Sequence, residues 1–259
     1  PGAHLSKHCR TFAHNLMRTR YSVLLLGLAA VLWVVVNLPA SMLRYVIAPS
    51  FGTLITPVDT LWRGSSQLVT PLGIQAKLQW DTTLWHPGVN FALIDAKTSI
   101  KGRLEPSLSN IRASLSGQLD AQTLAPLLAR YDLFVPGIFD LQPTNLHFGA
   151  DRLTMLSPSQ LQWSGGQVRY ILANRRYDAL MPPLFASITA RDDGALEANV
   201  TLSSADAAPL LILRLNPSGS VYLGVTRGML RLANYPWTGN EAETEMIFEV
   251  ERGLAQPFT

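Results

Sequence analysis

The chain has 259 residues, of which 47% are hydrophobic, with a single cysteine and a formal net charge of +3. Residues 1–44 hold five of the 21 Lys and Arg residues and no acid, so residues 45–259 carry 16 basic against 18 acidic side chains. A nucleic-acid-binding domain concentrates positive charge in its folded part, and this distribution argues against nucleic acid as a partner. Since Cys9 stands alone, no disulfide is expected, and a domain of this size can be stable without one.

Residues 21–43 form an uncharged, mostly apolar run between Arg20 and Arg44. A helix of that length spans roughly 34 Å, enough for a hydrocarbon core of about 30 Å. We therefore expect a single transmembrane helix over residues 21–43. The basic residues before it place a tail of residues 1–20 in the cytoplasm and residues 44–259 on the exported side. A cleaved export signal and a soluble helix are the alternatives left open.

Strand-like alternation of apolar and polar residues follows the apolar run. It occurs in four segments, residues 72–80, 111–119, 196–202 and 245–251. Such alternation is typical of strands with one buried and one wet face. Turn residues at Asp193-Gly194 and at 216–219 (Asn-Pro-Ser-Gly) predict two hairpins. The sequence thus predicts a mainly β fold, a curled antiparallel sheet.

One short helix is expected in the exported part. Leucines at helical spacing and Tyr131 predict it over residues 123–131, with Asp120 or Thr123 as its N-cap. Pro126 fits only in the first turn. We expect this helix to lie across the sheet and cover a face.

A weak internal repeat divides the exported part. The segments KLQW at residues 77–80 and QLQW at 160–163 lie 83 residues apart and each ends an alternating run. The repeat predicts two related modules, about residues 58–119 and 120–259, within one domain. Coincidence is the alternative, because so few identical residues carry little information.

Catalytic chemistry has little support in the sequence. Outside residues 1–44 the only histidines are His86 and His147, and neither stands in a metal-binding or acid–base pattern. Phosphate-cradle and nucleophile-elbow motifs are absent. We therefore expect no enzyme activity, no metal and no cofactor.

The tryptophans carry more information than the charges. Trp80 and Trp163 end amphipathic runs, which favours packing in the core. Trp62 and Trp237 lie in turn-like segments, which favours contact with a partner or with lipid.

These features together resemble the type II secretion system protein N family of Gram-negative bacteria. The resemblance rests on the basic tail, the apolar run and short motifs spread over nearly the whole chain: TLWRGS at 60–65, LQW at 78–80, IKGRL at 100–104 and LQWSGGQVRY at 161–170, with a looser match at YPWTGN. The family-motif or interaction candidates are Thr60, Leu61, Trp62, Gly64, Trp80, Trp163, Gly165, Gly166 and Trp237.

The resemblance implies an accessory inner-membrane component with its main domain in the periplasm, supporting the export of folded proteins. Its partners would be other type II secretion subunits of the inner-membrane platform or the secretin, reached by a strand added at a sheet edge; a homo-oligomer is left open. The resemblance extends distantly to AsmA-like lipid-handling proteins. That relation implies the alternative, a lipid-binding or lipid-transfer module with an apolar groove, lined by residues such as Ile74, Leu78, Trp80, Leu196 and Val200. Alternating apolar residues cannot separate a core from a lipid groove.

Overall fold

The computed structural model describes residues 25–46, 52–71, 73–82, 88–107, 110–149, 153–172, 174–203 and 208–253. Strands make up 56% and helices 17%, and most of the strands belong to one large antiparallel sheet. The prediction of a mainly β fold is therefore confirmed. His86 and the tail of residues 1–20 lie outside the described residues.

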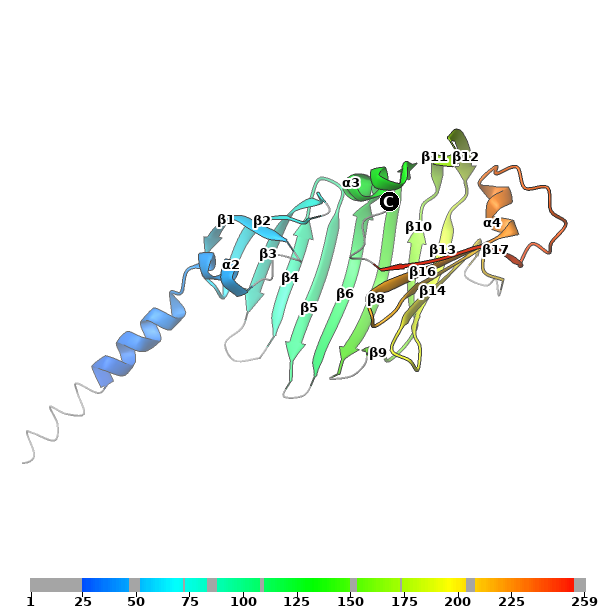
Figure 1. The fold of residues 1–259 in the computed structure, drawn as a ribbon. Coiled ribbons are helices and arrows are strands. Elements are labelled where there is room, and N and C mark those ends of the chain that lie inside the picture. Colours follow the sequence, from blue (N-terminus) through cyan, green and yellow to red (C-terminus); the bar gives the residue numbers. More distant parts are fainter. Residues whose placement is uncertain are drawn as a thin grey trace, which may run out of the picture.

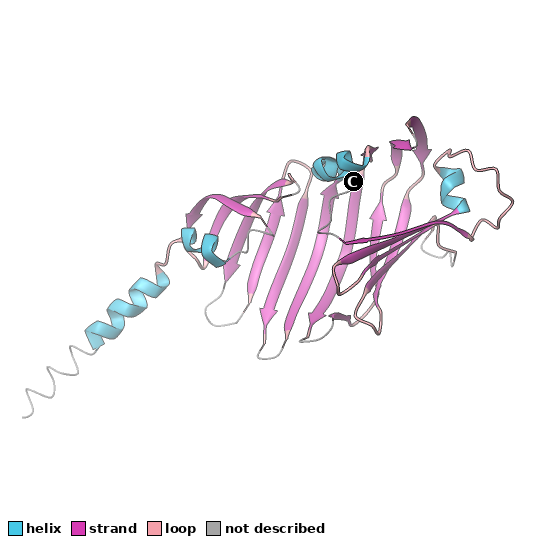
Figure 2. Cartoon of the chain, viewed as in Figure 1, coloured by secondary structure: helices cyan, strands magenta, loops and turns pink. Residues whose placement is uncertain are grey.

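The large sheet has 14 strands and curls, so that β14–β17 return in front of β8 and β10 (Figures 1 and 2). Consecutive strands are neighbours almost throughout, as expected where short turns join antiparallel strands. Along the sheet, the strands are β1 (Thr53–Asp59), β2 (Arg63–Val69), β3 (Gln75–Thr82), β4 (Val89–Ile94), β5 (Ser99–Pro106), β6 (Ile111–Asp120), β8 (Ile138–Phe148), β10 (Ser159–Trp163), β13 (Leu184–Ala190), β14 (Leu196–Thr201), β15 (Leu211–Leu215), β16 (Ser220–Thr226) and β17 (Met246–Gly253), with β9 (Leu153–Met155) beside β8.

Both predicted hairpins form. Asp193 and Gly194 lie in the turn between β13 and β14, where Gly194 has a φ of 82°. The turn between β15 and β16 has Gly219 at a φ of 80°. Positive φ costs glycine little, which explains why these two positions mark the turns.

The predicted helix forms as three short pieces, η2 (Ala121–Leu124), α3 (Ala125–Leu128) and η3 (Ala129–Tyr131). Asp120 is the cap, because its side chain accepts a hydrogen bond from the Gln122 amide, and Pro126 lies in the first turn of α3. Its expected position across a face of the sheet is wrong. The helix begins where β6 ends and lies at the upper edge of the sheet in Figure 1.

Residues 25–36 are helical, and the helix ends before the Leu43 boundary expected from the sequence. Asn37 donates both its backbone amide and its side-chain amide to the Trp33 carbonyl. Pro39 then lies in extended conformation before η1 (Ala40–Met42) and α2 (Leu43–Val46). No helix within the described ranges has the length and hydropathy to cross a membrane, and residues 21–24 of the expected span lie outside those ranges.

A smaller sheet and a further helix were not expected from the sequence. The sheet pairs β12 (Arg175–Met181), β11 (Gly166–Leu172) and β7 (Leu133–Phe134). The helix α4 (Arg227–Leu232) is capped by the Thr226 hydroxyl, which accepts from the Met229 amide. Both elements contribute to the hydrophobic core. That core combines Trp163, Ala179, Met181 and Leu184 with Val135, Phe139, Val168, Val200, Leu210, Met229 and Leu232.

Candidate functional site

One face of the large sheet is apolar from β3 to β17. Residues paired across antiparallel strands point to the same side, so the strand register shows which side chains share this face. Trp80 pairs with Phe91, and Leu78 pairs with Leu93. The same face continues through β5, β6 and β8 with Ile100, Leu104, Ala113, Leu115, Leu146 and Leu141.

The same pattern continues on the returning strands. Leu161 pairs with Ala186, which pairs with Val200. The last strands add Leu211, Leu213, Leu215, Val221, Leu223, Val225, Phe248 and Val250. We call this surface the inner face. At one end of the curled sheet, the hydrophobic core packs against it through α4 and β12.

The opposite face is polar and exposed. Gln75, Lys77 and Gln79 alternate with the apolar side chains of β3. On β14, the Glu197 carboxylate accepts hydrogen bonds from Arg191 and Arg214 at 2.9 Å each. Burial alone would raise the pKa of Glu197, but the two guanidinium groups outweigh it and hold the pKa below its ordinary value. The inner face is thus the apolar side of a two-sided sheet.

Coverage of the inner face differs along the sheet. Around β10 and β13, the core described above buries Trp163 and Leu184. Over β3–β6, Figure 1 shows a single layer of strands, and among the described elements none packs broadly against them except their sheet neighbours. There, Leu78, Phe91 and Leu115 are only half-buried. On the inner face, the apolar surface of β3–β6 is therefore open, whereas the apolar surface of β10 and β13 beside it is covered by the core.

Two of the predicted motif residues, Leu61 and Gly64, contact Trp80, and a third, Thr60, lies in the adjacent turn. The Trp80 ring is buried and donates its indole N–H to the Leu61 carbonyl at 3.1 Å. Gly64 pairs with Trp80, and a Cβ at Gly64 would lie 2.6 Å from the indole ring. The Thr60 hydroxyl accepts from the Arg63 amide and closes the turn before β2. These residues position the Trp80 ring.

A second cluster repeats this arrangement. Trp163 donates its indole N–H to the Pro136 carbonyl at 2.8 Å, and its ring stacks on Phe139. Trp80 pairs with Gly64 and Trp163 pairs with Phe139. In both cases the indole donates to the carbonyl of the residue three positions before that strand partner. Gly165 and Gly166 follow with φ of 78° and 142°, so the chain can turn directly into β11. The core packing predicted for Trp80 and Trp163 is observed at both positions.

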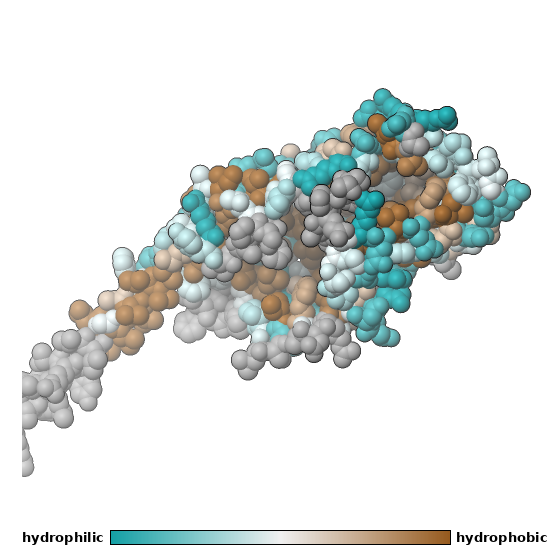
Figure 3. All heavy atoms as spheres, in the orientation of Figure 1, coloured by the Kyte–Doolittle hydropathy of each residue, from teal (hydrophilic) through white to brown (hydrophobic). Residues whose placement is uncertain are grey.

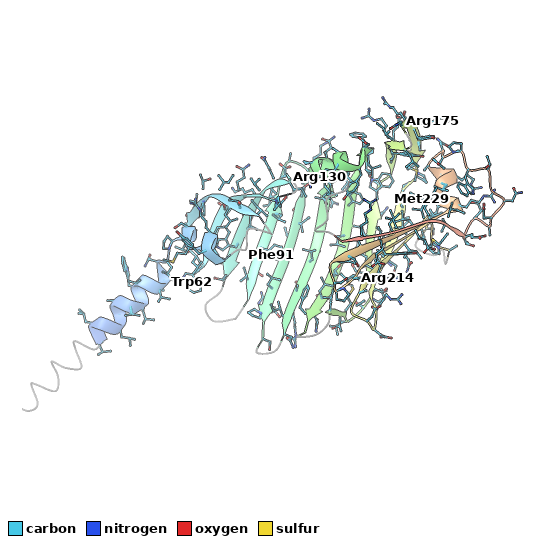
Figure 4. All side chains as sticks on the ribbon, in the orientation of Figure 1. Trp62, Phe91, Arg130, Arg175, Arg214 and Met229 are labelled. Carbon is cyan, nitrogen blue, oxygen red and sulfur yellow. The ribbon has the colours of Figure 1, made fainter. Side chains whose placement is uncertain are left out.

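Trp62 lies at the junction between the N-terminal helix and the sheet (Figure 4). Its indole N–H donates to the Val35 carbonyl at 2.8 Å, so it satisfies a carbonyl at the end of that helix. The Leu61 amide donates to the Leu38 carbonyl at 2.7 Å, and Pro39 forms a bridge with Thr60. The helix and the sheet are therefore joined by one side-chain hydrogen bond and by a short antiparallel backbone bridge. The turn-like segment around Trp62 did not indicate this intramolecular role.

Trp237 lies apart from the other motif residues. Its indole N–H donates to Glu241, and its ring packs edge-on against Phe248 of β17 at 5.7 Å. Further ring contacts connect Phe248 through Tyr235 and Tyr177 to Tyr170. Burial raises the pKa of Tyr170, and so do its neighbours Tyr177 and Tyr235. This aromatic row joins β11, β12 and β17, and no sequence motif indicated it.

A separate cleft of about 360 Å³ lies between α3 and β11. Its walls include Leu128, Phe134 and Ile171, and the Arg169 guanidinium lies 4.3 Å above the Phe134 ring. Arg169 and Tyr170, the last two residues of the LQWSGGQVRY motif, line it, whereas the nine motif or interaction candidates named from the sequence do not. Among the residues that the structure describes, no three His, Cys, Asp or Glu side chains are grouped closely enough to hold a metal.

Comparisons with known proteins found no relative. No family model, no curated protein and no solved structure matches the chain.

Proposed function

We propose that this chain is a membrane-anchored binding protein without catalytic activity, and that its inner face takes up the acyl chains of a membrane lipid. The observation that carries the proposal is the apolar surface shared by β3–β6, which is half-buried and has no described layer over it. Leu78, Phe91 and Leu115 belong to it. Of the two functions weighed from the sequence, this is the one that the geometry supports better.

The physical reason is the free energy of apolar burial. Each CH₂ group removed from water contributes about 0.8 kcal/mol. An extended acyl chain is narrow and has no backbone hydrogen bonds to satisfy, so it can lie on a sheet face that offers only apolar side chains.

Anchoring in the membrane is supported by the N-terminal helix. Its described residues, 25–36, are apolar on all sides and exposed, with Trp33 at 69% exposure. Figure 3 shows them as a continuous hydrophobic surface. A helix that is apolar all round is stable when protein or lipid surrounds it. The proposed topology has residues 1–20 in the cytoplasm and the sheet in the periplasm. Alkaline phosphatase fused to the C-terminus tests it: we expect the fused phosphatase to be active, and an inactive fusion would contradict the topology.

The lipid proposal is tested with a matched pair of variants in β3. Leu78→Glu places a charge on the inner face, whereas Gln79→Glu places one on the polar face. Full-length protein extracted in mild detergent is analysed by native mass spectrometry. We expect bound phospholipid in the wild type and in Gln79→Glu, and a loss of at least about tenfold in Leu78→Glu. Absence of lipid from the wild type, or equal lipid in both variants, would contradict the proposal.

A second candidate is the non-enzymatic scaffold role in type II secretion. The motif residues that carry the resemblance support it, because they build the joint between helix and sheet. The equivalent indole bonds of Trp80 and Trp163 support the two related modules that the resemblance implies. Photo-crosslinkers at Tyr45 and Gln79, both exposed, test the role in cells. Crosslinks to inner-membrane secretion subunits or the secretin are expected, and their absence with unimpaired secretion in a deletion strain would rule it out.

A further inference from the structure

Among the described strands, β17 pairs only with β16, and its outer edge differs from those of β1 and β12. At the opposite end, β1 contains Pro57, a register shift and two residues of positive φ, Thr56 and Asp59. Such features prevent another strand from pairing. In the small sheet, Asn234 donates to the Asp178 carbonyl of β12. By contrast, β17 contains no proline and pairs in regular register with β16 from Ser220 to Val225, and its register shift lies beyond that stretch, between Val225 and Thr226.

The register also shows which backbone groups face this edge. The Asn216 amide donates to Ser220 and the Thr226 amide donates to Leu210, so even-numbered residues of β16 bond toward β15. Odd-numbered residues then bond toward β17, where their partners are Phe248, Val250 and Arg252. Consequently Glu249 and Glu251 direct their backbone N–H and C=O groups away from the sheet.

The side chains at this edge have a distinct chemistry. Phe248 and Val250 lie on the inner face and are exposed at 36% and 45%. Glu249 and Glu251 lie on the polar face, and no salt bridge joins either to a described cation. Glu251 accepts from the neutral donors Asn216 and Ser220, which leave its charge in place. From Phe248 to Glu251 the edge therefore presents apolar and anionic side chains in alternation, and Arg252 follows on the inner face.

We propose that the β17 edge binds an extended partner segment in which apolar and basic residues alternate. Its apolar residues would continue the inner face beside Phe248 and Val250, and its basic residues would lie opposite Glu249 and Glu251. A second copy of this chain fits poorly, because antiparallel pairing of two β17 strands through these residues places a glutamate opposite a glutamate. The inference rests on the scaffold role and does not depend on lipid binding.

The test uses the full-length protein in neutral detergent with fluorescent eight-residue peptides. One peptide alternates valine with lysine, a second alternates valine with glutamate, and a third has the first composition with its lysines contiguous. We expect the alternating lysine peptide to bind at least about tenfold more tightly than either control. Equal binding of the lysine and glutamate peptides would overturn the proposal.

Variants separate the backbone contribution from the charges. Glu249→Pro removes an outward-facing N–H without removing a bond to β16, and it should weaken binding by about tenfold or more. Glu249→Gln with Glu251→Gln should keep pairing but reduce the preference for lysine over glutamate to below about threefold. Glu105→Gln, on β5, is the matched charge control and should bind like the wild type.

A measurement on the wild type covers the case in which the proline variant fails to fold. Saturating lysine peptide should slow hydrogen exchange at the Glu249 and Glu251 amides, and unchanged exchange at both would refute the proposal. Leu78→Glu should bind the peptide normally, so a failure of this inference can be distinguished from a failure of the lipid proposal.

Discussion

Replacing Trp163 with phenylalanine removes one hydrogen bond and part of one buried ring. Trp163 is 7% exposed, and its indole N–H is bonded to the Pro136 carbonyl at 2.8 Å. This bond is part-buried, and a carbonyl left there without its donor costs about 1–3 kcal/mol. The smaller ring loses roughly one further kcal/mol of apolar burial. We therefore expect Trp163→Phe to lower the free energy of unfolding by about 2–4 kcal/mol.

Trp62→Phe is the matched control for that change. It also removes an indole bond to a carbonyl, that of Val35, but Trp62 is only half-buried. Water can replace the lost donor there, so the expected cost is about 0.5–1 kcal/mol. The assay is urea unfolding of the full-length protein in detergent, followed by far-UV circular dichroism. A cost for Trp163→Phe no larger than that for Trp62→Phe would refute the reasoning.

Three further predictions concern stability. The pKa of Glu197 is lower in the folded state than in the unfolded chain, so the ionised carboxylate stabilises the fold above the unfolded pKa, and this stabilisation is lost as pH falls through the folded pKa. Glu197→Gln should therefore flatten the pH dependence of acid-induced unfolding below about pH 5. An unchanged acid-unfolding profile would contradict this. Asp120→Ala removes the cap of η2 and should cost about 0.5–2 kcal/mol in thermal or urea unfolding; no change would show that the cap is not needed. Gly102→Ala places a Cβ 2.9 Å from the Ser114 carbonyl and against the Phe91 ring, so a loss of about 1–3 kcal/mol is expected, and a stabilised protein would argue against this close packing.

The local features of the fold could be predicted from the sequence. Asp193-Gly194 and Asn216–Gly219 mark their hairpins because turn residues act within a few positions. Alternation also identified the inner face on β3, β6, β14 and β17. The helix after β6 was predicted because Asp120 and Pro126 are local signals.

The non-local features could not be predicted in this way. β6 pairs with β8, while β7 joins β11 in another sheet, and no local pattern specifies such pairing. The helix α4 has six residues, including Gly228, which is too short for a helical period to be recognised. The hydrogen bond from Trp62 to Val35 joins residues 27 positions apart, which no local pattern can indicate. The turn-like sequence around Trp62 therefore suggested an external contact instead.

The joint at Trp62 determines how the sheet can move relative to the N-terminal helix. Because a helix-end carbonyl and the following segment are bonded to residues before β2, a rotation of the helix about its own axis must turn the sheet with it. A free swivel would require breaking these bonds first. The β1 end of the sheet is therefore fixed beside the helix. The β17 edge is then the far end, twelve strand spacings or roughly 58 Å away along the curl.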